Sequence, residues 1–114
     1  MIPKISVITP IYKTEQYLDK CLTALVNQTL PDIEFVWIDN GASDECRNII
    51  AKYADKHQHI KVVHLLQNKG YGGAMNAGLE VATGDYIGFV ILMIGLTRIT
   101  LKNYIMPPRR TTPT

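Results

Sequence analysis

Short apolar runs recur along the first ninety residues, and amphipathic stretches separate them. The run 33–38 is almost continuously apolar, which is typical of a parallel strand buried on both faces. Runs of this kind, bounded by proline, asparagine and glycine, predict strands. The predicted strands are 4–9, 33–39, 60–66 and 85–90.

The stretches between these runs have apolar side chains at helical spacing, and they predict helices at 14–27, 43–56 and 73–82. Thr14 and Ser43 stand where a helix N-cap is expected. Glycine-rich residues 70–73 predict a turn before the third helix. Regular alternation of strands and helices predicts an α/β fold, a Rossmann-like parallel sheet with helices on both faces.

The composition is that of one folded domain: 114 residues, 46% hydrophobic and 19% charged. A formal net charge of +2 is too small to suggest a nucleic-acid partner. Cys21 and Cys46 have no metal-ligand spacing, and the N-terminus shows no signal peptide. These features favour a reducing, cytoplasmic compartment.

Residues 91–114 differ from those before them. Residues 1–90 carry eight Lys or Arg against ten Asp or Glu, whereas 91–114 carry four Lys or Arg, no acid and three of the six prolines. No helical or strand period is found from residue 96 onward. The sequence therefore predicts a structured part over 1–90 and a basic tail over 91–114, which suggests peripheral association with the inner face of a membrane.

Polar residues cluster where three of the predicted strands end, at 9–12, 39–41 and 68–76. Ligands of open parallel sheets bind outside the carboxyl ends of the strands, so these clusters are candidates for a small-molecule site. They could equally be ordinary turn residues. Asp39 is an exception, because a carboxylate directly after a buried strand needs a partner.

Several familiar sites are excluded. The glycine-rich segment 70–75 is not G-x-G-x-x-G, and no Gly-Lys-Ser/Thr is present, which argues against a dehydrogenase or an NTPase. The histidines form no metal-binding motif. His57 and His59 are interpreted as exposed turn residues, and the cysteines as core residues. The histidines are His57, His59 and His64.

Five segments in order resemble the family 2 glycosyltransferases, a large inverting group with the GT-A fold. They are 5–12, 27–34, 38–44 (similar to I-D-D-G-S-x-D), 68–78 (similar to N-x-G-x-x-x-A-R-N-x-G) and 83–87. Each motif is weak alone, but the five in order at the family's spacing are specific. The resemblance covers 4–90 and implies the N-terminal, nucleotide-binding half of a GT-A domain.

The resemblance implies transfer of a sugar from a nucleotide-diphospho-sugar, UDP-linked, in polysaccharide or lipid-linked glycan assembly. Asp39 would accept a hydrogen bond from the uracil imide, and the helix after the glycine-rich turn would point its N-terminus at the diphosphate. The implied donor-binding residues are Thr9, Pro10, Tyr12, Glu15, Asp39, Asn40, Asn68, Gly70 and Asn76.

Three departures from the family pattern bear on activity. Asn40 replaces the second acid of the D-D-G motif, and Met75 replaces an arginine. At 91–95, Ile-Leu-Met-Ile-Gly replaces the family's D-S-D-D-W, whose D-x-D holds Mn²⁺ or Mg²⁺. No carboxylate follows Asp85, so no metal ligand, retained cofactor or catalytic residue is predicted, and the chain is expected to be inactive.

Two other interpretations stay open: a catalytically dead nucleotide-binding remnant or interaction module, and an unstable fragment with an uncovered sheet edge. The sequence does not predict the sugar, the acceptor, the linkage or the oligomeric state.

The basic tail also suggests a shift of reading frame. D-S-D-D-W can be encoded GAT-TCT-GAT-GAT-TGG, and reading from the second base gives ATT-CTG-ATG-ATT-GG, which encodes Ile-Leu-Met-Ile-Gly. These are residues 91–95 of this chain. The sequence therefore predicts translation out of frame from about Ile91 onward.

Overall fold

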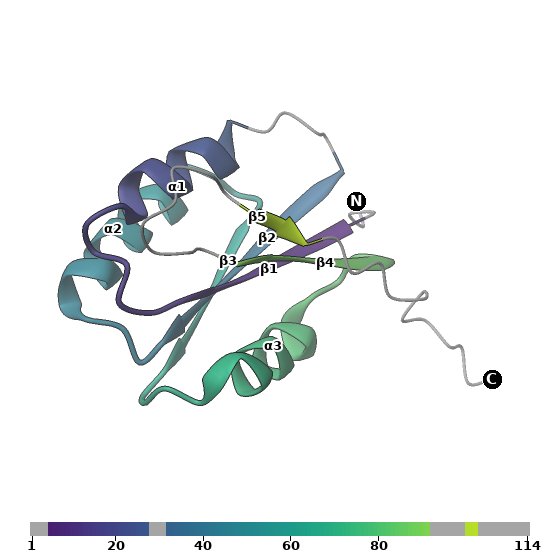
Figure 1. Ribbon diagram of the computed structural model, residues 1–114. Helices are drawn as coiled ribbons and strands as arrows, with labels where there is room; N and C mark the ends of the chain where they lie inside the picture. The colour runs from purple at the N-terminus through teal and green to yellow at the C-terminus, as the bar shows by residue number, and fades with distance from the viewer. Residues whose placement is uncertain (1–4, 28–31, 92–99, 103–114) are drawn as a thin grey trace.

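The computed structural model describes residues 5–27, 32–91 and 100–102. Strands and helices alternate along the chain (Figure 1). The elements are β1 (Ile5–Ile11), α1 (Leu18–Val26), β2 (Ile33–Asn40), α2 (Asp44–Ala54), β3 (Ile60–Leu65), α3 (Gly70–Val81), β4 (Tyr86–Ile91) and β5 (Thr100–Lys102).

The strands form one sheet in the order β3-β2-β1-β4-β5. The first four strands are parallel, as the sequence predicts, and β1 pairs with β2 from Ile5 opposite Ile33 to Ile11 opposite Asp39. The fifth strand, β5, pairs antiparallel with β4 and was not predicted. With three residues, β5 is too short to leave a detectable alternation in the sequence.

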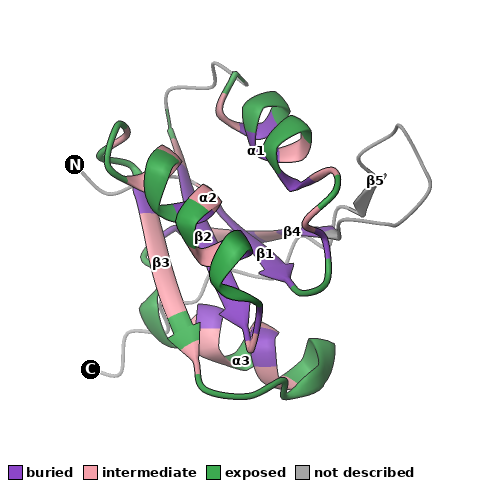
Figure 2. Ribbon diagram, turned by 90° about the vertical axis from the view of Figure 1, so that its left-hand side faces the viewer, coloured by how far each residue is buried: buried purple, intermediate pink, exposed green. Residues whose placement is uncertain are grey.

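The helices cover both faces of the sheet: α1 and α2 lie on one side and α3 on the other (Figure 1). Side chains of β2 alternate between the two cores that result. Phe35 and Trp37 pack with α1 and α2, whereas Val36 and Ile38 pack with α3. Figure 2 shows the buried central strands between the helices. Burial on both faces explains why β2 is almost continuously apolar.

The start of α1 differs from the prediction. The helix begins at Leu18, not at residue 14, and no side chain caps it. The Thr14 carbonyl accepts hydrogen bonds from the amides of Tyr17 and Leu18, while its hydroxyl lies 4.0 Å from the Cys46 sulfur. Because the hydroxyl points toward α2, Thr14 closes a turn before the helix instead of capping it.

The prediction for α2 is confirmed at its start, because the Ser43 hydroxyl accepts a hydrogen bond from the Cys46 amide at 3.3 Å. In contrast, α3 begins at Gly70, three residues before the predicted start. Its middle lies very close to β1, because a Cβ at Gly78 would be 2.7 Å from the Ile8 side chain. A small residue is therefore required for α3 to cover this face.

None of the helices in the described part of the chain is long and apolar enough to cross a membrane. Most of the predicted basic tail, at 92–99 and 103–114, lies outside the described residues, and so does the predicted frame shift there.

Candidate functional site

A cavity of about 240 Å³ lies at the carboxyl ends of β1 and β2, beside the start of α3. Its wall combines side chains from three connections that are far apart in the sequence. The lining residues are Pro10, Tyr12, Thr14, Asn40, Asn68, Gly70 and Tyr71. The structure thus brings the three predicted polar clusters together at one edge of the sheet.

Five of the nine predicted site residues line this cavity: Pro10, Tyr12, Asn40, Asn68 and Gly70. Two further lining residues were not proposed for the site. Thr14 was interpreted as a helix cap, and Tyr71 lies inside the glycine-rich segment, where an aromatic residue between two glycines was the available signal. Tyr71 is 58% exposed and Tyr12 is 39% exposed, so both rings are accessible to a ligand.

The other four predicted residues lie outside the cavity wall. Thr9 is fully buried, and its hydroxyl has no hydrogen-bond partner among the described residues. Glu15 is half-buried and accepts a hydrogen bond from the Cys46 sulfur at 3.4 Å. Asn76 is exposed on α3. Asp39, the fourth, is fully buried behind the wall.

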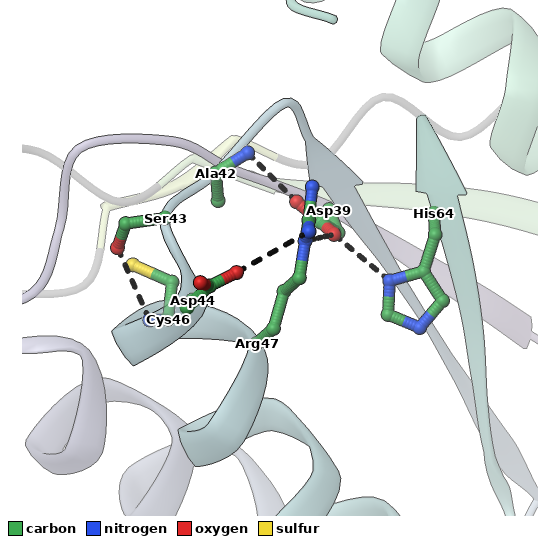
Figure 3. A network of polar contacts seen from close by, with 7 residues as sticks. All are labelled: Asp39, Ala42, Ser43, Asp44, Cys46, Arg47 and His64. Carbon is green, nitrogen blue, oxygen red and sulfur yellow. Dashed lines mark hydrogen bonds and ion pairs between the residues drawn. The ribbon is translucent and has the colours of Figure 1, made fainter. Parts of the chain in front are cut away.

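Asp39 has three hydrogen-bond donors around it (Figure 3). Its Oδ1 accepts from the Ala42 amide at 2.8 Å. Its Oδ2 accepts from Arg47 Nε at 2.8 Å and lies 2.8 Å from His64 Nδ1. The expectation that this carboxylate needs a partner is confirmed. His64 lies on β3, within the predicted strand 60–66.

The pKa of Asp39 reflects two opposing effects. Burial favours the neutral acid and raises the pKa, but the hydrogen bonds from His64, Ala42 and Arg47 favour the carboxylate. The hydrogen bonds prevail, so the pKa of Asp39 lies below its ordinary value of 3.8. Asp39 is therefore a buried, compensated negative charge that braces α2 and β3 against β2.

Acid is expected to weaken the fold through this carboxylate. Because the folded pKa of Asp39 is lowered, its stabilising contribution is complete above pH 3.8 and is lost as the pH falls toward the folded pKa. Urea unfolding between about pH 5 and pH 2 measures this loss. The wild-type chain is expected to lose more unfolding free energy than Asp39→Asn over that interval, and equal losses would contradict the assignment.

Asn40, the next residue on β2, points to the opposite face and holds the β3–α3 loop (residues 66–69) and the start of α3. Its Oδ1 accepts from the Lys69 amide at 2.9 Å, and its Nδ2 donates to the Gly70 carbonyl at 3.3 Å. Asn68 adds a local cap, because its Oδ1 accepts from the Gly70 amide at 2.8 Å. These contacts explain why α3 starts at Gly70.

The sequence agrees with this architecture. Residues 6–90 match the sequence profile of Glycosyl transferase family 2. This chain belongs to glycosyltransferase family 2. Among its relatives, EpsJ of Bacillus subtilis is 40% identical over 90 residues, which cover 79% of this chain and 26% of EpsJ. The poly(ribitol-phosphate) beta-glucosyltransferase of Bacillus spizizenii is 37% identical, over 76% of this chain and 14% of that enzyme.

Solved glycosyltransferase structures show the same fold. S. aureus TarS 1–349 in complex with UDP-GlcNAc superposes with a TM-score of 0.70 at 35% identity, over 77% of this chain and 26% of TarS. The mannosyltransferase PcManGT from Pyrobaculum calidifontis, in complex with GDP-Man and Mn²⁺, has a TM-score of 0.70 at 23% identity and supports the fold alone. The chain thus spans about a quarter of the length of EpsJ and TarS.

The described residues of this chain do not offer a site that fits a divalent cation. Within residues 5–27, 32–91 and 100–102, no group of three or more His, Cys, Asp or Glu side chains could hold a metal ion. The strand β4 ends at Ile91, and Val90 before it offers no oxygen ligand from its side chain. No step involving a metal is therefore assigned to these residues.

Proposed function

We propose that this chain forms the donor-nucleotide site of a family 2 glycosyltransferase and that its ligand is a UDP-linked sugar. The observation that carries the proposal is the cavity at the carboxyl edge of the sheet, walled by Tyr12, Asn40 and Tyr71. A position of this kind is where open α/β sheets bind ligands. TarS, which is 35% identical, is known in complex with UDP-GlcNAc, and this favours uracil as the base.

The cavity has the groups that a nucleoside diphosphate requires. The exposed rings of Tyr12 and Tyr71 offer faces on which a base stacks. The N-terminus of α3 begins at Gly70 in the wall, and no acidic residue occurs in its first turn. The Gly70 amide already donates to Asn68, but the helix dipole favours an anion at such a position, so the diphosphate is assigned there.

Asp39 is proposed to bind the uracil imide. Its present hydrogen bonds determine whether an acceptor position remains free for the imide N–H. An ionised carboxylate has about four acceptor positions, of which three are used by Ala42, Arg47 and His64. The imide N–H would take the remaining position or displace the exposed His64. Because Asp39 is fully buried and does not line the cavity, the base can reach it only after a local adjustment.

We assign donor binding, and not sugar transfer, to this chain by itself, because none of the residues that the structure describes is identified as a base or a metal ligand. A nucleotide-binding remnant is therefore the second candidate. The proposal also includes glycan assembly on the cytoplasmic side of a membrane, with peripheral attachment by the basic tail.

The assignment of inactivity is tested by incubation of the chain with UDP-sugars and Mn²⁺. Release of UDP would overturn this assignment.

UDP is expected to bind weakly and without dependence on Mn²⁺. Tyr71→Ala should lower the affinity by about 1–3 kcal/mol, the typical value of one base–aromatic stack. Isothermal titration of the full chain with UDP, with and without Mn²⁺, measures both effects. The control is Leu66→Ala, because Leu66 is 97% exposed in the β3–α3 loop that precedes Tyr71 and does not line the cavity.

Two results would contradict the proposal. Binding of UDP by Tyr71→Ala with unchanged affinity would move the base away from this cavity. A strong increase of affinity with Mn²⁺ would show that the chain has a metal site outside the described residues.

A further inference from the structure

Two exposed lysines stand beside the cavity, in two connections that contribute to its wall. Lys13 follows Tyr12 in the β1–α1 connection (residues 12–17), and Lys69 precedes Gly70 at the end of the β3–α3 loop. Tyr12 and Gly70 both line the cavity. The lining residues are all uncharged, so the charge that a bound anion meets comes from the residues next to them.

Neither lysine is neutralised by a carboxylate within the part of the chain that the structure describes. Each ion pair found there uses another basic residue: Arg47, Lys52, Lys61 or His64. Glu15, the acid nearest to Lys13 in the sequence, accepts a hydrogen bond from the Cys46 sulfur. Two uncompensated positive charges beside an uncharged wall favour an anionic ligand.

Lys13 has a backbone conformation that side chains disfavour. Its φ is +52°, and among the described residues it is the one residue other than glycine with a positive φ. Such conformations persist where the surrounding structure fixes them, and they collect at ligand sites. The Nζ atom of Lys13 lies over the ring of Tyr12, 5.3 Å from its centre. An ammonium group therefore lies next to a ring on which the base is proposed to stack.

The contact between Lys13 and Tyr12 can be exchanged for a contact with a phosphate. A cation–π contact at an exposed position is weak, whereas an ammonium donates strong, charge-assisted hydrogen bonds to phosphate oxygens. A nucleotide whose base stacks on Tyr12 has its phosphates one ribose away from the ring, within reach of a flexible four-carbon side chain.

We propose that Lys13 and Lys69 form a two-lysine clamp that binds the diphosphate of the nucleotide. Lys69 acts beside the first turn of α3, and Lys13 acts from the β1–α1 connection. The inference rests on the proposed function, which places the nucleotide in this cavity, and it names the side chains that supply positive charge to the diphosphate.

The experiment compares a ligand that has the diphosphate with one that lacks it. UDP and uridine are titrated separately into the full chain without divalent cations, and binding is followed by chemical-shift changes in NMR spectra. Lys13→Gln and Lys69→Gln each remove one ammonium and keep most of the stem. Lys20→Gln is the matched control, because Lys20 is exposed on α1 and is not next to a lining residue.

In each of the two clamp variants the affinity for UDP is expected to fall about three- to tenfold, because an exposed charge-assisted contact is lost. The affinity for uridine should change less than about twofold, because uridine has no phosphate. Lys13→Arg should bind UDP nearly as the wild type does, since the positive charge is kept. Lys20→Gln should leave both affinities unchanged, and added salt should reduce the losses of the clamp variants.

An unchanged affinity for UDP in either clamp variant would overturn the inference and leave the proposed function standing. Equal losses for UDP and uridine would also overturn it, because the lysine would then act on the fold or on the base and not on the diphosphate. Absence of UDP binding by the wild-type chain would overturn the proposed function, and this inference with it.

Discussion

Asp39→Ala is expected to lower the free energy of unfolding by about 2–4 kcal/mol, because a buried hydrogen-bonded charge is lost. The buried Ala42 amide loses its acceptor, and Arg47 loses its ion pair. Arg47 and His64 are partly exposed and regain water, which keeps the cost below that of a fully buried pair. Urea denaturation at neutral pH measures the difference.

The control for this variant is Asp44→Ala. Asp44 also pairs with Arg47, at 3.5 Å, but its side chain is 94% exposed. Its removal should change the unfolding free energy by no more than about 0.5 kcal/mol, as is usual for surface pairs. If both variants are equally stable, Asp39 does not brace α2 and β3 as described.

Gly41→Ala is expected to destabilise the fold by about 3 kcal/mol or more, since two costs combine. Gly41 has a φ of +71°, in the left-handed region that disfavours side chains. A Cβ there would lie 2.5 Å from the Asn68 amide nitrogen and 2.7 Å from the Gln67 carbonyl carbon. Both contacts are with backbone, so the β3–α3 loop would have to move. Thermal and urea unfolding measure the loss.

Gly72→Ala is the matched control in the same region. Gly72 lies in α3, and a Cβ there would meet nothing within 4 Å. The substitution should be neutral or stabilise by up to about 1 kcal/mol, because alanine favours helix more than glycine does. A similar loss in both variants would point to a general sensitivity of the loop, and not to the crowding at Gly41.

The parallel sheet could be predicted because its signals are local. Each buried strand is a short apolar run, and each helix has its own apolar stripe, so the order of elements follows from the sequence. The start of α3 could not be predicted in the same way. Glycine has low helix propensity, and the contacts that fix the start of α3 at Gly70 include the side chain of Asn40, thirty residues earlier. Tertiary hydrogen bonds outweigh propensity at this point.

The candidate site, too, could be predicted from the sequence only in part. Its edge was predictable, because the carboxyl ends of parallel strands must meet on one side of a sheet. The partners of Asp39 were not: Arg47 comes from a helix and His64 from the next strand, and no spacing in the sequence marks either of them. Whether a polar residue lines the cavity or lies behind it depends on which face of the strand it occupies.

The pairing of β2 with β1 decides which of two consecutive polar side chains, Asp39 or Asn40, faces the cavity. Asp39 and Asn40 are consecutive, so they point to opposite faces, and Ile11 lies opposite Asp39. A slip of β2 by one residue would turn the carboxylate toward α3 and the amide toward Arg47, because side chains alternate with a period of two. The register of β2 thus decides whether the amide of Asn40 or the carboxylate of Asp39 faces the cavity, and a shift of this register by one residue would exchange the two.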